Sequence, residues 1–147
     1  MTLDPNLKSR ILQAVEDGFA EQVSFTQQLV QTPSLRGHEH AIQDLLFRNL
    51  QSRGYAMDRF KMDRAAIEAH PGGSKYSDDH SDAPIVVGIH RPRDEAGRSL
   101  ILQSHLDVVP EGPHDMWAEP PFSARIRGDW MYGRGAGDMK AGAAANI

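Results

Sequence analysis

The chain has 147 residues, of which 39% are hydrophobic and 24% charged, with a formal net charge of -4 and no cysteine. This composition is typical of one soluble globular domain. The slight acidic excess, without a Lys/Arg cluster, argues against partnership with nucleic acid or an anionic membrane. Without cysteine, any metal must be held by His, Asp or Glu. Neither a signal sequence nor an apolar run of ~20 residues is encoded, which predicts a cytoplasmic protein.

The first part of the chain predicts two helices. Asp4-Pro5 is a favourable helix start, and Pro33 ends the first helix. The second helix covers residues 38–52, and Gly54 is its stop. Both helices are expected to pack on the core through an apolar face; that of the first consists of Leu7, Ile11, Val15, Phe19 and Val23.

Two histidines open the second helix. His38 and His40 are two residues apart and therefore do not face each other on a helix. We interpret both as solvated side chains rather than metal ligands.

The middle of the chain predicts strands around a polar excursion. Residues 55–60 alternate as a strand does. Residues 61–83 give no clear pattern, and within them residues 71–82 are expected to form a surface loop or excursion. Residues 84–90 and 99–103 are two apolar runs joined by a turn, which predicts a buried hairpin or adjacent strand pair. One acidic group in the excursion is interpreted as solvated rather than metal-binding: Asp78, Asp79, His80 and Asp82.

The first candidate metal-binding residues follow the end of the second apolar run. On an extended segment, His105 and Asp107 point the same way while Leu106 turns into the core. A histidine next to a carboxylate can serve as a metal ligand and the group that orients it.

A second stretch supplies another carboxylate. A hairpin over residues 124–132, turning at Gly128-Asp129, leads into glycines at positions 133, 135 and 137. Asp138 follows them, just before a helix of small residues that starts near Met139. Imidazole and carboxylate donors together suit a zinc-like divalent ion.

Residues 104–110 (SHLDVVP) and 132–140 (YGRGAGDMK), with Trp117 and the Pro121-Phe122 pair between them, resemble the zinc-dependent aminoacylase and peptidase family. This family includes acetylornithine deacetylase, succinyl-diaminopimelate desuccinylase and glutamate carboxypeptidase. The resemblance is strong over residues 99–142. It implies an α/β fold with a mixed sheet and flanking helices, as the amino-terminal part of a di-zinc catalytic domain.

The resemblance also implies a role for each matching residue. His105 would ligate one of two zinc ions, for which Co²⁺ is a possible substitute. Asp107 would be the catalytic carboxylate that orients His105. Asp138 would bridge the two metals and be followed by a cis peptide bond to Met139. The substrate would be an N-acyl amino acid or a peptide, such as an N-acetylated one.

The family's later glutamate pair, which provides the general base and a zinc ligand, does not occur in this sequence. Residues 1–147 are therefore expected to be the amino-terminal portion of the catalytic domain, without the lid domain through which a full-length homodimer would form. Such a chain would be inactive alone.

Other interpretations remain open. The Gly133–Gly137 loop could belong to a nucleotide-binding module, although its spacing is not G-x-G-x-x-G and Asp138 would repel phosphate. The chain could instead be a non-catalytic interaction domain with Trp117, Phe122 and Trp130 on its surface, but such aromatics are more often core. We expect Arg134 to anchor the glycine loop and Lys140 to pair with an acidic neighbour.

Overall fold

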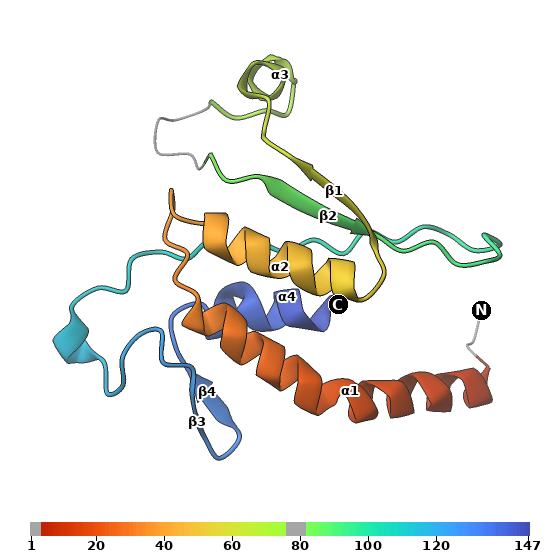
Figure 1. The fold of residues 1–147 in the computed structure, drawn as a ribbon, viewed down its shortest axis with the longest axis horizontal. Helices are drawn as coiled ribbons and strands as arrows, with labels where there is room; N and C mark the ends of the chain where they lie inside the picture. The colour runs from red at the N-terminus through yellow and green to blue at the C-terminus, as the bar shows by residue number, and fades with distance from the viewer. Residues whose placement is uncertain (1–3, 76–81) are drawn as a thin grey trace.

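The computed structural model describes residues 4–75 and 82–147. Figure 1 shows helices stacked near the centre, with paired strands on either side of them. The elements in chain order are α1 (Pro5–Gln31), α2 (His40–Ser52), β1 (Ala56–Phe60), α3 (Arg64–Ala69), β2 (Ile85–Ile89), a 3-10 turn (His114–Met116), β3 (Arg125–Arg127), β4 (Trp130–Tyr132), a wide irregular turn (Ala136–Lys140) and α4 (Ala141–Ala145).

The predicted first helix is confirmed as α1. The Asp4 side chain accepts a hydrogen bond from the Asn6 backbone N–H, and Pro5 occupies the first turn. The expected packing along its whole length is wrong. Ile11, Val15 and Phe19 are about half exposed, because no other segment of the described chain covers this end of the helix.

The core forms where the other end of α1 meets α2 and α4. Its buried members come from four segments of the chain and are Phe25, Leu29, Ile42, Leu106, Ala143 and Ala144. In Figure 1, α4 lies between α1 and α2. The small side chains of α4 let it pack closely on α1. The second predicted helix is confirmed as α2. The stop at Gly54, which has a φ of 83°, is confirmed too.

β1 and β2 form an antiparallel pair that packs on α2, with Ala56 opposite Ile89 and Phe60 opposite Ile85. The strand predicted over residues 55–60 is confirmed. The partner predicted for residues 84–90 was wrong, since that strand pairs with β1 rather than with residues 99–103. In the described residues the strands form two separate two-stranded antiparallel sheets, so the fold mixes helices and strands but lacks the expected mixed sheet.

The prediction of a buried strand at residues 99–103 was also wrong. Leu100, Ile101 and Leu102 are 79%, 88% and 56% exposed. Among the described residues no strand pairs with this segment, so its apolar side chains have no surface to pack against.

The excursion after β1 holds one element that the sequence did not predict. The short helix α3 begins after Asp63, whose side chain caps it by accepting a hydrogen bond from the Ala66 N–H. The group of Asp78, Asp79 and His80 lies outside the described residues.

β3 and β4 form the predicted hairpin, with Ile126 opposite Met131 and Gly128 in the left-handed region at φ 58°. Trp130 is 72% exposed, so the expectation that this aromatic belongs to the core was wrong. None of the described helices is both long and apolar enough to span a bilayer.

Candidate metal centre

The histidine segment, residues 104–110, has an extended conformation. Ser34 attaches it to the rest of the chain. Leu106 and Val108 are buried, whereas His105 and Asp107 turn outward, as the alternation predicted. The buried hydroxyl of Ser34 donates to the carbonyl of Leu106 at 2.6 Å. The Val108 N–H in turn donates to the Ser34 carbonyl at 2.9 Å. Ser34, in the turn between α1 and α2, is thus hydrogen-bonded to both residues that flank Asp107.

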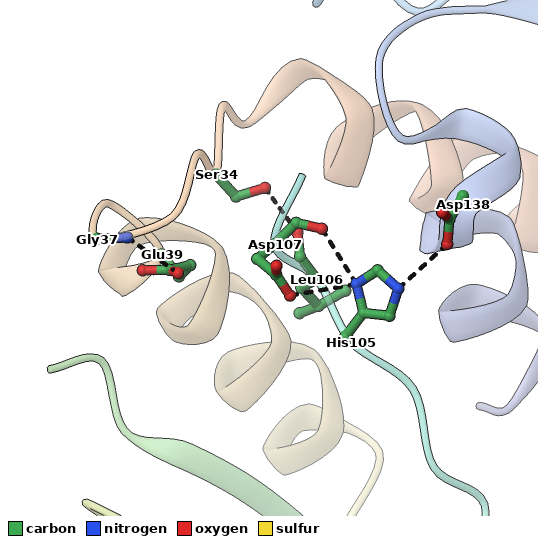
Figure 2. A network of polar contacts seen from close by, with 7 residues as sticks. All are labelled: Ser34, Gly37, Glu39, His105, Leu106, Asp107 and Asp138. Carbon is green, nitrogen blue, oxygen red and sulfur yellow. Dashed lines mark hydrogen bonds and ion pairs between the residues drawn. The ribbon is translucent and has the colours of Figure 1, made fainter. Parts of the chain in front are cut away.

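His105 lies between two carboxylates, as Figure 2 shows. Its Nδ1 is 3.2 Å from Oδ1 of Asp107 and 3.1 Å from the Asp107 backbone carbonyl. Its Nε2 is 3.1 Å from Oδ1 of Asp138. The structure therefore brings together all three residues singled out from the sequence, across 33 positions of chain. An Nδ1–H donated to Asp107 leaves the Nε2 lone pair directed at Asp138.

Asp138 lies in the irregular turn that links the glycine run to α4. The Asp138–Met139 peptide bond is cis, as expected. The glycines before it serve close packing, because a Cβ on Gly133 would lie 2.5 Å from Val30 and one on Gly135 would lie 2.5 Å from Val108. Close packing on α1 and on the histidine segment accounts for Gly133 and Gly135 without a bound phosphate, whereas a Cβ on Gly137 would meet nothing within 4 Å.

The three side chains line a shallow pocket of about 210 Å³ with Gly135 and Arg134. The side chain of Asp138 is 90% exposed and that of His105 is 48% exposed, so the site opens to solvent. Among residues 4–75 and 82–147, no group of three or more His, Asp or Glu side chains could hold a metal ion. What the geometry provides is part of a coordination shell.

This donor set fits a zinc ion. Bonds of 2.0–2.1 Å in a tetrahedral shell place two ligand atoms about 3.3 Å apart, close to the separation of His105 Nε2 and Asp138 Oδ1. The carboxylate on the other ring nitrogen matches the arrangement that commonly orients a metal-bound histidine. His105 and Asp138 would be the residues that hold such an ion.

Lys140 differs from its prediction. Its ammonium group does not pair with an acidic neighbour but donates to the carbonyls of Leu29 and Thr32, at 2.9 and 3.0 Å. The side chain is fully buried, and this burial lowers the pKa of Lys140 to about 8. Those carbonyls lie at the end of α1, where helix geometry leaves acceptors short of donors; that of Leu29 also accepts the Thr32 N–H at 3.2 Å. Sequence spacing alone gave no sign of this contact, because the partners are more than 100 residues away.

Arg134 lies beside the pocket and stacks on an aromatic ring. Its guanidinium is 5.3 Å from the centre of the Trp117 ring, and both residues donate to the backbone carbonyl of Glu111. The expected anchoring through a backbone carbonyl is confirmed. Glu111 lies on the loop that Arg134 contacts. The pKa of the Glu111 carboxyl is lowered mainly by a hydrogen bond from the Glu111 backbone amide, and next by a hydrogen bond from His114.

Comparison with known proteins points the same way. Residues 101–147 match the model of peptidase family M20/M25/M40. Over 122 residues the chain is 33% identical to a succinyl-diaminopimelate desuccinylase of Acidovorax ebreus strain TPSY. The matched region covers 83% of this chain and 29% of that protein. It is 31% identical over 125 residues to a protein of that name from Delftia acidovorans, covering 85% and 29% respectively.

These matches make the chain a relative of metal-dependent hydrolases. The chain belongs to peptidase family M20/M25/M40. It spans less than a third of the length of the curated relatives it matches.

Proposed function

We propose that this chain supplies part of the active site of a zinc-dependent amidohydrolase that removes the acyl group from an N-acyl amino acid. The observation that supports the proposal most directly is the position of His105, with Asp107 on one ring nitrogen and Asp138 on the other. Imidazole and carboxylate atoms converge here on a space open to solvent, where a small substrate could enter.

His105 and Asp138 would be the zinc ligands, with Asp138 bridging two ions. Asp107 would fix the tautomer and the ring orientation of His105, and would make its Nε2 more basic and therefore a stronger metal ligand. Zinc bound in such a site lowers the pKa of coordinated water and polarises a carbonyl, and Co²⁺ is a possible substitute. The contribution of this chain is to hold the three side chains in place before metal and substrate arrive.

Residues outside this chain would complete the site. No two consecutive glutamates occur in the sequence, so the general base and the remaining ligands expected for the family must come from elsewhere. We therefore expect the isolated chain to be inactive. An N-succinyl amino acid is the first substrate to consider, because the matched relatives are named desuccinylases. An acetylornithine-type substrate, a homodimeric full-length enzyme and a cytoplasmic location remain predictions.

Zinc binding to the half-site can be tested by NMR on the chain labelled with ¹⁵N-histidine. We expect added Zn²⁺ to perturb the ring nitrogens of His105, and Asp138→Asn to abolish this change. Two protein ligands make a weak site, so the titration should extend to millimolar Zn²⁺.

The chain offers a matched control in His114, whose Nε2 is 3.3 Å from Oε1 of Glu111. This is also a histidine–carboxylate contact on the surface. His114→Gln should leave the response of His105 unchanged. If Zn²⁺ perturbs His114 and His105 alike, or if Asp138→Asn responds as the parent does, the proposed site is refuted.

A further inference from the structure

The segment that carries His105 and Asp107 and the turn that carries Asp138 are both hydrogen-bonded to the region at the end of α1. The two sets of bonds are independent of each other. Lys140 follows Asp138 by two residues and reaches the Leu29 and Thr32 carbonyls. Ser34, only two residues beyond Thr32, bonds to both Leu106 and Val108. Figure 2 shows the bond from Ser34 reaching the backbone of the histidine segment next to Asp107.

The polar groups that make these contacts are inaccessible to water. Ser34 and Lys140 are both 0% exposed. A buried hydroxyl or ammonium group is costly unless its hydrogen bonds are satisfied, so neither side chain can leave its acceptors cheaply. The negative end of the α1 dipole adds to the hold on the Lys140 ammonium. Each contact therefore fixes the backbone of one metal-site segment.

No strand ladder among the described residues performs this task. The histidine segment has a single isolated parallel bridge, between Leu35 and Val108. The Asp138 turn lies outside any described sheet, and the dihedral angles of Asp138 and Met139 are not helical. The two segments touch directly where Gly135 meets Val108 and where Asn146 Nδ2 donates to the Gln103 carbonyl at 3.3 Å. The buried bonds of Ser34 and Lys140 add a common support to these direct contacts.

We propose that residues 29–34 are that common support, and that Ser34 and Lys140 are positioning residues of the metal site. This inference rests on the proposed function for its purpose, but the geometry it describes can be measured without metal. Ser34 holds the His105–Asp107 segment, and Lys140 holds Asp138 opposite it.

The test is long-range ¹H–¹⁵N NMR of the histidine rings in the chain with a chelator present, the His105 signals being assigned by their loss in His105→Gln. In Ser34→Ala we expect the shifts of both ring nitrogens of His105 to move toward those of the exposed His40. Lys140→Met should move mainly Nε2, the nitrogen that faces Asp138. Ser34→Cys keeps the side-chain shape, at a slightly larger volume and with a weaker donor, so it should give an intermediate shift even if the alanine variant fails to fold.

Thr26 supplies a matched control. It is also buried, and its hydroxyl donates to the Gln22 carbonyl at 2.8 Å, but this bond lies within α1. Thr26→Val should lower stability without moving the His105 signals. If Ser34→Ala, Ser34→Cys and Lys140→Met all fold and leave both ring nitrogens unchanged, Ser34 and Lys140 are ordinary core residues and the inference fails.

Metal then separates this inference from the proposed function. With both correct, the Zn²⁺ concentration that perturbs His105 should rise about tenfold in Ser34→Ala, the lower end of the usual effect of outer-shell partners. If the ring shifts move in the metal-free variants while Zn²⁺ never affects the parent, the positioning role stands and the zinc proposal falls. If the ring shifts stay unchanged while zinc binds normally, the zinc proposal stands and the positioning role falls.

Discussion

The two halves of α1 have the same helical pattern but very different surroundings. In the second half, Phe25, Leu29 and Val30 are almost completely buried against α4 and neighbouring segments. In the first half, Leu7, Leu12 and other apolar residues are 41–59% exposed. Hydrophobic periodicity specified the helix in both halves, but burial required a partner that only the second half has. The end of α1 that organises the metal site is also its packed end.

The largest effect should come from removing a leucine at each end. Leu29 is 0% exposed, so Leu29→Ala leaves a cavity in the core and should lower the free energy of unfolding by about 2–5 kcal/mol. Leu12 is 59% exposed, so Leu12→Ala should change it by no more than about 0.5 kcal/mol. Urea unfolding followed by circular dichroism measures both variants. Equal losses would mean that the first half is packed as well as the second.

Local signals predicted the local structure well. The Asp4 cap, the stop at Gly54 and the turn at Gly128 each depend on neighbouring residues only, and all three are present. The outward direction of His105 and Asp107 followed equally from alternation along an extended segment.

What failed were the predictions that needed a distant partner. An apolar run such as residues 99–103 shows that burial would be favourable, but not which segment would cover it. The contacts of Ser34 and Lys140 were missed for the same reason, because they join positions 72 and 108–111 residues apart. The facing of His105 and Asp138 was foreseen only through resemblance to a family.

Two glycines near α1 should respond to alanine in opposite ways. At Gly133 a new Cβ would lie 2.5 Å from Cγ1 of Val30, so Gly133→Ala should cost about 1–3 kcal/mol through overpacking. At Gly18, within the exposed half, a Cβ would meet nothing within 4 Å. Gly18→Ala should therefore stabilise the chain by about 0.5–1 kcal/mol through better helix propensity. Thermal unfolding of the two variants and the parent gives the comparison, and a shift in the same direction for both would contradict it.

The last expected effect is a dependence of stability on pH that belongs to the packed half alone. Burial lowers the pKa of Lys140 from 10.5 to about 8. Between these values the unfolded chain binds more protons at this position than the folded chain does. The contribution of Lys140 to the free energy of unfolding should therefore rise with pH, starting near 8 and levelling off above 10.5.

Measuring the difference between the parent and Lys140→Met by urea unfolding at about pH 7.5 and about pH 10 isolates this contribution, because other titrating groups are common to both. We expect the difference to move in favour of the parent by on the order of 1 kcal/mol at the higher pH. Lys8→Met, at the exposed end of α1, should show no such change. A difference that moves in the opposite direction would mean that the carbonyls of Leu29 and Thr32 outweigh burial. The end of α1 would then bind the ammonium group more strongly than its burial opposes it.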